Sequence, residues 1–342
     1  MIELFLVSGI TLFAIMLTWI FDFVNGFHDS ANSIATIVAT KVLTPVKAVG
    51  LAAFFNFLGI LYVSEVAMTI KKGIIREELI IEYGIPIVLS TLLGAIIWDL
   101  ITWWFGIPTS SSHALVGGLL GSGGAAAGLG AVVWSGTMKT SIFIIISPLA
   151  GLIIGFFIVA MVMRAAKNSK RAIANKWFRR LQLASSAFYS FTHGTNDAQK
   201  GMGIIMLILL ADPLTTALVL QHDGVFLWVA VSCHAAIALG TFFGGWRIVK
   251  TMASRITKLE PYQGFSAETG AASILAVTAF FGIPVSTTHT ISGSIMGVGA
   301  ARRLSAVRWG VGRRIVVAWI LTIPAAATIS GLIFLGYLHL LY

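Results

Sequence analysis

The chain has 342 residues, of which 57% are hydrophobic and 11% are charged. Soluble domains carry about 25% charged residues, so this composition excludes a soluble globular protein and predicts an integral membrane protein. Its apolar segments lack the alternation of barrel strands, which predicts an all-α polytopic fold. The net charge of +10 lies in short loops. We therefore expect anionic lipid headgroups, and no nucleic acid, as partners.

Long apolar segments follow one another along the chain. A straight membrane helix needs about 20 residues, so the first, third and seventh segments are too long for one helix. Each of these three contains a polar or Gly/Pro motif, where we expect the helix to break. The segments lie near 4–40, 48–70, 85–127, 142–163, 185–210, 225–246, 262–300 and 315–338.

Loop charges indicate how the chain crosses the membrane. The basic linker 164–184 is expected in the cytoplasm, as are the basic loops 247–260 and 302–314. Both flanks of 262–300 are then cytoplasmic, so this segment must enter and return as a re-entrant helical hairpin. The flanks of 85–127 are placed outside, so the equivalent hairpin enters from the opposite face. Both chain termini fall outside on this path.

Two polar motifs each occur twice. One reads Asn-Gly-Phe-His-Asp-Ser-Ala-Asn at 25–32 and His-Gly-Thr-Asn-Asp-Ala-Gln-Lys at 193–200. The other reads Gly-Ile-Pro-Thr-Ser-Ser-Ser-His at 106–113 and Gly-Ile-Pro-Val-Ser-Thr-Thr-His at 282–289. The copies of the two motifs are 168 and 176 residues apart. Such similar offsets indicate one unit used twice.

The duplication divides the chain into two repeats. The first covers 1–163 with its hairpin at 85–127, and the second covers 185–342 with its hairpin at 262–300. The linker 164–184 joins them. Because the hairpins enter from opposite faces, we expect inverted-topology repeats with broken helices, an arrangement typical of secondary transporters.

The aspartate motifs predict a cation site. Asp29 and Asp197 lie near the middle of apolar segments, where a buried charge is costly and is a functional candidate. A carboxylate with amide and backbone oxygens suits a hard monovalent cation, and the motif glycines would let the backbone open. A polar clasp between helices is the alternative. The neighbouring candidates are Asn25, His28, Asn32, His193, Asn196, Gln199 and Lys200.

Further buried charges have weaker assignments. Asp22 stands two helical turns before Asp29, so it predicts a second cation site or a proton relay. Glu268 is another acidic candidate within an apolar segment. Lys200 would either neutralise Asp197 or contact an anion.

The hairpin motifs predict an anion site. Pro108 and Pro284 suit the first turn of a helix, so a helix should begin after each Gly-Ile-Pro break. Free backbone N–H groups, hydroxyls and the positive dipole end would surround one tetrahedral oxyanion between the two hairpins. Close packing of small residues is the alternative. The hydroxyl candidates are Thr109, Ser110, Ser111, Ser112, Ser286, Thr287 and Thr288.

Serine beside histidine also raises the alternative of an intramembrane hydrolase. Neighbouring residues on a helix do not face each other, so Ser112 and His113 are not a nucleophile–base pair. We therefore expect no enzyme activity and no covalent cofactor.

These motifs together resemble those of the PiT-type inorganic phosphate transporter family, over nearly the whole chain. The Gly-x-Asn-Asp signature of the family is matched at 26–29, where His28 replaces its Asn, and at 194–197. Its Pro-x-Ser/Thr hairpin tips are matched at 108–112 and 284–288. The resemblance implies a symporter in the cell membrane that imports inorganic phosphate by alternating access, with arsenate as an analogue. It is also compatible with a homodimer.

The resemblance implies roles for the candidate residues. Phosphate would be bound by Ser110, Ser111, Ser112, Ser286, Thr287 and Thr288, and Na⁺ by Asp29 and Asp197 with Asn25, Asn32 and Asn196. Cations would relieve the repulsion between two carboxylates and phosphate, so each ligand would help the other to bind. Oxygen-rich surroundings favour Na⁺; H⁺ coupling or a metal–phosphate substrate is the alternative. A passive anion channel, which needs no midplane aspartates, is a more remote one.

Overall fold

The computed structural model of the protein describes residues 7–62, 66–222 and 224–341. These residues form α-helices and short 3-10 helices, with no β-ladder among them. In chain order the elements are α1 (Gly9–Ala39), α2 (Pro45–Leu58), η2 (Gly59–Leu61), α3 (Val66–Gly73), α4 (Glu77–Tyr83), α5 (Ile85–Phe105), α6 (Ser111–Ala127), η3 (Gly128–Ala131), α7 (Trp134–Ala166), α8 (Arg171–Ala211), α9 (Thr216–Gln221), α10 (Leu227–Phe243), α11 (Trp246–Ser254), α12 (Pro261–Phe280), α13 (Thr287–Arg302), η4 (Leu304–Ala306) and α14 (Trp309–Leu341).

Several of these helices are long and apolar enough to cross a membrane. Five described helical stretches meet this condition, namely α1, α5, α6 continued by η3, α7 and α14. Helices α10 and α11 make a sixth span if the 69° bend between them lies inside one crossing. The protein is therefore an all-α, multi-pass membrane protein, as its composition predicts.

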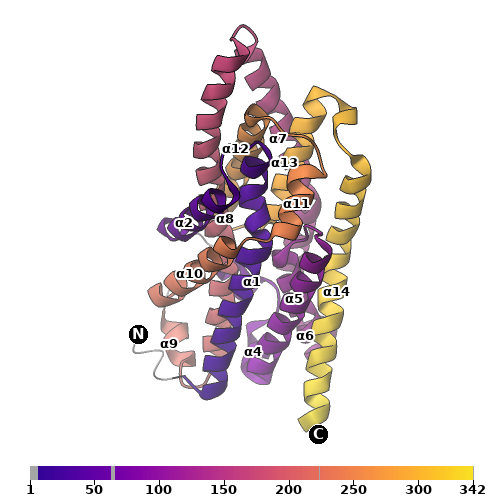
Figure 1. The fold of residues 1–342 in the computed structure, drawn as a ribbon. Coiled ribbons are helices and arrows are strands. Elements are labelled where there is room, and N and C mark those ends of the chain that lie inside the picture. Colours follow the sequence, from indigo (N-terminus) through magenta and orange to yellow (C-terminus); the bar gives the residue numbers. More distant parts are fainter. Residues whose placement is uncertain (1–6, 63–65, 223, 342) are drawn as a thin grey trace.

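Helices from the two halves of the chain pack on one another reciprocally. Helix α1 packs against α10 of the second half, and α8 packs against α2 of the first (Figure 1). In the same way α7 packs on α13 and α14 packs on α6. A duplicated unit predicts such an exchange of partners. The inverted topology of the two copies, and the re-entrant placement of the hairpins, remain predictions.

The expected break in the first apolar segment is wrong. Helices α1 and α8 both run unbroken through their aspartate motifs. The motif glycines allow close packing instead of an open backbone. A Cβ atom on Gly26 would lie 2.2 Å from the carbonyl oxygen of Ile237, and one on Gly194 would lie 2.1 Å from that of Asn56. Each motif glycine therefore brings a helix of the other half into backbone contact.

The expected linker 164–184 is also wrong in its extent. Only residues 167–170 separate α7 from α8, and 171–184 form the first turns of α8. Lys and Arg are good helix formers, so a basic sequence does not end a helix. Similarly, the expected loop 247–260 contains most of α11, and the expected span 48–70 is divided between α2, η2 and α3.

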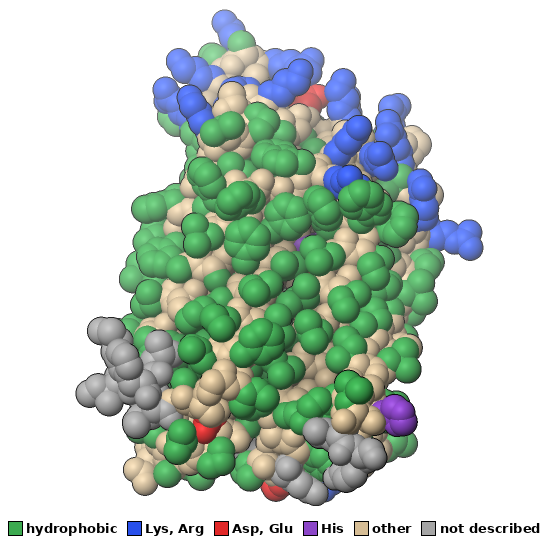
Figure 2. Space-filling model, turned by 60° about the horizontal axis from the view of Figure 1, so that its bottom comes forward, with side chains coloured by type: hydrophobic (Ala, Val, Ile, Leu, Met, Phe, Trp, Pro, Cys, Tyr) green, Lys and Arg blue, Asp and Glu red, His purple; other side chains and the backbone are tan. Residues whose placement is uncertain are grey.

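Basic side chains gather at one end of the molecule. Figure 2 shows Lys and Arg side chains gathered at one end, above a broad surface of hydrophobic side chains. The turn between α7 and α8 lies at the upper end in Figure 1, whereas α1 begins and α14 ends at the lower end. This arrangement agrees with a cytoplasmic basic end and outside termini, which remain predictions.

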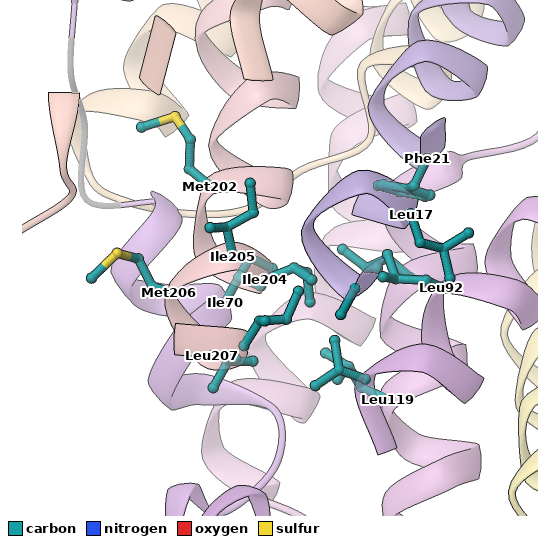
Figure 3. Close-up of a cluster of buried hydrophobic side chains, with 14 of the residues drawn as sticks. Leu17, Phe21, Ile70, Leu92, Leu119, Met202, Ile204, Ile205, Met206 and Leu207 are labelled. Carbon is teal, nitrogen blue, oxygen red and sulfur yellow. The ribbon is translucent and has the colours of Figure 1, made fainter. Parts of the chain in front are cut away.

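The hydrophobic core consists of two clusters with the polar motifs between them. On α1 the first cluster ends at Val24 and the second begins at Ala31. On α8, Tyr189 belongs to the second cluster and Ala198 to the first. Figure 3 shows the first cluster, where α8 side chains face those of α1, α5 and α6. The aspartate motifs thus lie in a polar layer with apolar packing on both sides.

A carboxylate just beyond α8 joins this helix to the start of α1. Thr11 Oγ1 donates to Asp212 Oδ2 at 2.5 Å, and the backbone N–H groups of Ser8 and Leu214 donate to the same carboxylate, both at 2.9 Å. Burial raises the pKa of Asp212, but these hydrogen bonds lower it more, so its pKa lies below the usual value.

We expect Asp212→Asn to destabilise the protein at neutral pH and to have little effect in acid. The folded-state pKa of Asp212 is lowered, so its contribution is present above the unfolded pKa of about 3.9 and is lost as the pH falls through the folded pKa. The expected loss at neutral pH is about 1–3 kcal/mol. Thermal unfolding of the purified protein, followed by tryptophan fluorescence, measures it.

Glu78→Gln is the matched control, because Glu78 is an exposed carboxylate on α4. It should leave the unfolding temperature unchanged at both pH values. An equal loss of stability for Asp212→Asn at neutral and acid pH would contradict the role assigned to the ionised carboxylate.

Candidate functional site

Both hairpin motifs form the same turn. Gly106, the C-cap of α5, has a left-handed φ of 64°, and the corresponding Gly282 after α12 has a φ of 61°. Glycine adopts this conformation without strain. Helices α6 and α13 then begin with an N-cap serine: Ser110 Oγ accepts from His113 N at 3.3 Å, and Ser286 Oγ accepts from His289 N at 3.1 Å.

The N-termini of α6 and α13 lie against each other in the interior. The rings of His113 and His289 are 4.7 Å apart at their centroids. Trp319 of α14 stacks on His289 at 4.0 Å and donates its indole N–H to the Pro108 carbonyl at 3.0 Å. The positive ends of two helix dipoles are thereby brought together, an arrangement that favours an anion between them.

Each hairpin tip is held by a threonine from the other half of the chain. Thr251 Oγ1, on α11, donates to the Gly106 carbonyl at 2.8 Å. Thr69 Oγ1, on α3, donates to the Gly282 carbonyl at 2.8 Å. We call these two hydrogen bonds the cross-half latches. They fix the turn from which α6 or α13 begins.

Asp29 lies at the N-terminal end of α13, beside Thr287 and Thr288, the first two residues of this helix. Thr288 Oγ1 donates to Asp29 Oδ2 at 3.3 Å and Thr287 Oγ1 at 3.4 Å. His28 Nδ1 lies 2.7 Å from Asp29 Oδ1, on the other side of the carboxylate. Asp29 is 3% exposed, so these groups replace its hydration.

Asp197 reaches the same hydroxyl from α8. Thr287 Oγ1 also lies 3.4 Å from Asp197 Oδ2, so this hydroxyl stands between the two carboxylates. His193 Nε2 lies 3.2 Å from Asp197 Oδ2, and the Lys200 ammonium contacts Asp197 Oδ1. Atoms of Asp29, His193 and Asp197 lie within 4.8 Å of one another, close enough to hold one ion.

The asparagines predicted as cation ligands have free oxygen atoms. The buried Oδ1 atoms of Asn25, Asn32 and Asn196 have no hydrogen-bond partner among the described residues. The amide nitrogen of Asn32 donates to Thr288 Oγ1 at 2.9 Å, and that of Asn196 to the Thr192 carbonyl at 2.8 Å. Buried acceptors without donors, together with carboxylates, fit a hard cation.

Ahead of its aspartate, each motif has one histidine and one asparagine, in exchanged positions. Asn25 and His28 precede Asp29 by four residues and by one residue, and His193 and Asn196 precede Asp197 in the same way. Both histidines nonetheless contact the aspartate of their own motif. An imidazole beside each carboxylate is therefore common to both halves.

The hydroxyl candidates of the first hairpin are buried at the start of α6. Ser110 is the N-cap, Ser111 is the first residue of the helix, and Ser112 Oγ contacts the Lys200 ammonium. Thr109 donates to Thr102 Oγ1 at 2.9 Å and lies 3.4 Å from His28 Nε2. This hairpin thus touches both aspartate motifs.

The remaining candidates face other elements. Gln199 accepts from the Ala67 N–H of α3, at 3.3 Å. Asp22 packs against Gly201, where a Cβ would lie 2.1 Å from its Oδ2. Glu268 accepts hydrogen bonds from Thr36, Gln182 and Ser185, in a separate polar cluster between α12, α1 and α8.

Some residues of the site were not predicted from the sequence. Asn56 lies 3.2 Å from His193 Nδ1, and Tyr189 donates to the Thr287 carbonyl at 3.3 Å. Thr102 lies 3.1 Å from His28 Nε2. Asn56 could have been selected as a candidate, because it is a polar residue within an apolar segment. Tyr189 and Thr102 carry no such signal, because both residue types are ordinary in apolar helices.

Comparisons with known proteins identify the family of this chain. A sequence profile described as the phosphate transporter family matches residues 25–330. The chain belongs to this family. As a member of the phosphate transporter family it is a transporter and not an enzyme, which confirms the resemblance read from the motifs.

Individual relatives are similar over nearly the whole chain. A Rhizobium meliloti protein named "Probable low-affinity inorganic phosphate transporter" is 51% identical, over 91% of this chain and 92% of that protein. A Bacillus subtilis protein of the same name is 43% identical, over 94% of this chain and 96% of that protein. A solved structure described as the sodium-dependent phosphate transporter superimposes with a TM-score of 0.86 at 27% identity, covering 98% of this chain and 100% of that one.

We expect Thr251→Val and Thr69→Val to weaken the hairpin tips. Valine has nearly the same shape but cannot donate, so each change leaves a glycine carbonyl without its donor, at a cost of about 1–3 kcal/mol. Each variant should unfold at a lower temperature than wild type. Thr328→Val is the control, because exposed Thr328 donates only within its own helix. Equal losses for all three variants would contradict a special role of the latches.

Proposed function

We propose that this phosphate transporter imports inorganic phosphate into the cell together with Na⁺, by alternating access. The observation that carries the proposal is the position of Thr287 Oγ1, 3.4 Å from a carboxylate oxygen of both Asp29 and Asp197. The two carboxylates that we assign to the cation therefore lie directly at the first turn of α13. A cation and an anion bound there would be neighbours.

Phosphate is assigned to the space at the N-termini of α6 and α13. The hydroxyls of Ser111, Ser112, Thr287 and Thr288 lie in the first turns of these helices, with Ser110 and Ser286 as caps. An oxyanion accepts hydrogen bonds from backbone N–H groups and hydroxyls, and the positive ends of the helix dipoles stabilise its negative charge.

Na⁺ is assigned to the carboxylate and amide oxygens of the two aspartate motifs. Asp29 and Asp197 would repel each other and the phosphate in an interior of low polarity. Na⁺ would remove this repulsion, so that neither ligand binds well without the other, and this mutual dependence couples their transport. The sodium dependence stated for the similar solved structure supports the choice of Na⁺.

H⁺ coupling is the second candidate. His28 lies 2.7 Å from Asp29 and His193 lies 3.2 Å from Asp197, so each carboxylate has an imidazole neighbour. Histidine is the side chain best suited to exchange protons near neutral pH. These pairs could carry a proton where the first candidate has Na⁺.

Radiolabelled phosphate uptake into proteoliposomes tests both candidates. We expect accumulation driven by an inward Na⁺ gradient, and loss of at least about 90% of it in Asp29→Asn and in Asp197→Asn, because each removes a negative charge that balances the positive charges of the occupied site. Accumulation driven only by an inward H⁺ gradient would show that the coupling ion is H⁺ and not Na⁺. Equilibration without accumulation under either gradient would contradict symport and favour a passive channel.

Glu78→Gln is again the matched control, an acid-to-amide change at an exposed position that should leave uptake unchanged. Folding of every variant is verified by size-exclusion chromatography before reconstitution. A loss of uptake in Glu78→Gln equal to that in Asp29→Asn would remove the assignment of Asp29.

We expect arsenate to inhibit phosphate uptake and sulfate to inhibit it at least about tenfold less. Phosphate and arsenate keep a proton at neutral pH and can donate it to a carboxylate, whereas sulfate has none to donate. Competition of each unlabelled anion with labelled phosphate measures the difference. Inhibition by sulfate equal to that by arsenate would contradict a substrate position beside the carboxylates.

A further inference from the structure

A lysine side chain is enclosed completely at the centre of the molecule. Lys200, on α8, is 0% exposed. Its ammonium group donates to Asp197 Oδ1 and to Ser112 Oγ, so it joins a carboxylate of the cation site to the first turn of α6. Removing an ammonium from water is costly unless a counter-charge and hydrogen-bond acceptors replace the water, and both are present here.

The first half of the chain has an uncharged residue in the same place. Asn32 is the last residue of the first aspartate motif and Lys200 is the last residue of the second. Asn32 donates to Thr288 Oγ1 at 2.9 Å, and Thr288 occupies in the second hairpin motif the position that Ser112 has in the first. The contact between motif and hairpin is thus the same in both halves, but only one of them carries a positive charge.

We propose that the Lys200 ammonium is a built-in cation, which replaces one exchangeable coupling ion beside Asp197. The inference rests on the proposed cation-coupled transport and specifies its stoichiometry. With Lys200 in place, the two aspartates and the lysine carry one net negative charge. With an asparagine at position 200, as at position 32 in the first half, the two aspartates would carry two net negative charges. A further cation would then be needed before phosphate binds.

The cation that moves with phosphate is then bound on the Asp29 side. Asp29 contacts His28, Thr287 and Thr288, none of which is a fixed cation. The unpartnered Oδ1 of Asn32 lies on the same helix, one turn after Asp29. The two halves, similar in their contacts, therefore differ in their use of ions.

The substitution Lys200→Asn tests this inference, because it gives the second motif the residue of the first. The cation-to-phosphate ratio is measured in proteoliposomes from the membrane potential at which net phosphate flux is zero, under set gradients of Na⁺, H⁺ and phosphate. We expect the ratio to rise by about one cation per phosphate relative to wild type, with a steeper dependence of uptake on cation concentration. An unchanged ratio in a transporting Lys200→Asn variant would overturn the inference.

Charge-pair variants keep the test decisive if Lys200→Asn does not fold. Asp197→Asn leaves the ammonium without its counter-charge and should abolish uptake. In the double variant Asp197→Asn with Lys200→Asn both charges disappear, so we expect uptake at least about tenfold above that of Asp197→Asn alone, with the wild-type ratio. Uptake no higher than in Asp197→Asn would overturn the inference, as would a ratio raised above wild type.

Lys200→Arg is the matched control, because it retains the positive charge. It should keep the wild-type ratio, and a ratio raised as in Lys200→Asn would contradict the charge as the cause. Wild type without uptake driven by Na⁺ or H⁺ would instead refute the proposed function itself. The two failures are therefore distinguishable.

Discussion

The structure depends on two carboxylates that approach the same hydroxyl group inside an apolar protein. Asp29 and Asp197 come from different halves of the chain and both lie 3.4 Å from Thr287 Oγ1. Their repulsion would destabilise the packing of α1, α8 and α13 unless positive or donor groups surround them. Histidines, hydroxyls, the Lys200 ammonium and two helix N-termini supply those groups. Two apolar clusters then exclude water on either side.

Helix ends do more here than terminate secondary structure. The turns at Gly106 and Gly282 direct the N-termini of α6 and α13 toward each other. His113 and His289 are in contact where these two N-termini meet. The dipole of each helix acts on the charges of both aspartate motifs, because each hairpin contacts residues from both halves. In the proposed function, substrate and ion would thus be bound at the same short stretch of backbone.

The sequence alone was most informative at residues whose burial costs much free energy. Asp29, Asp197 and the Ser/Thr runs could be selected as candidates because charged and polar groups in an apolar segment are costly and suggest a function. Glycine was misread, because in a membrane helix it permits either a break or a close contact, and only the neighbouring helix decides. Gly26 faces the backbone of Ile237, which no local pattern reveals. Trp319 and Tyr189 were missed for the same reason, since their roles arise from tertiary contacts.

The cross-half latches connect parts of the molecule that belong to different halves of the chain. Thr251 joins the first hairpin to α11, and Thr69 joins the second hairpin to α3. A displacement of either hairpin must carry a short helix of the opposite half with it, or break a hydrogen bond. Each hairpin is therefore tied to a helix of the other half, and the two halves of the chain cannot move independently of each other unless these hydrogen bonds break.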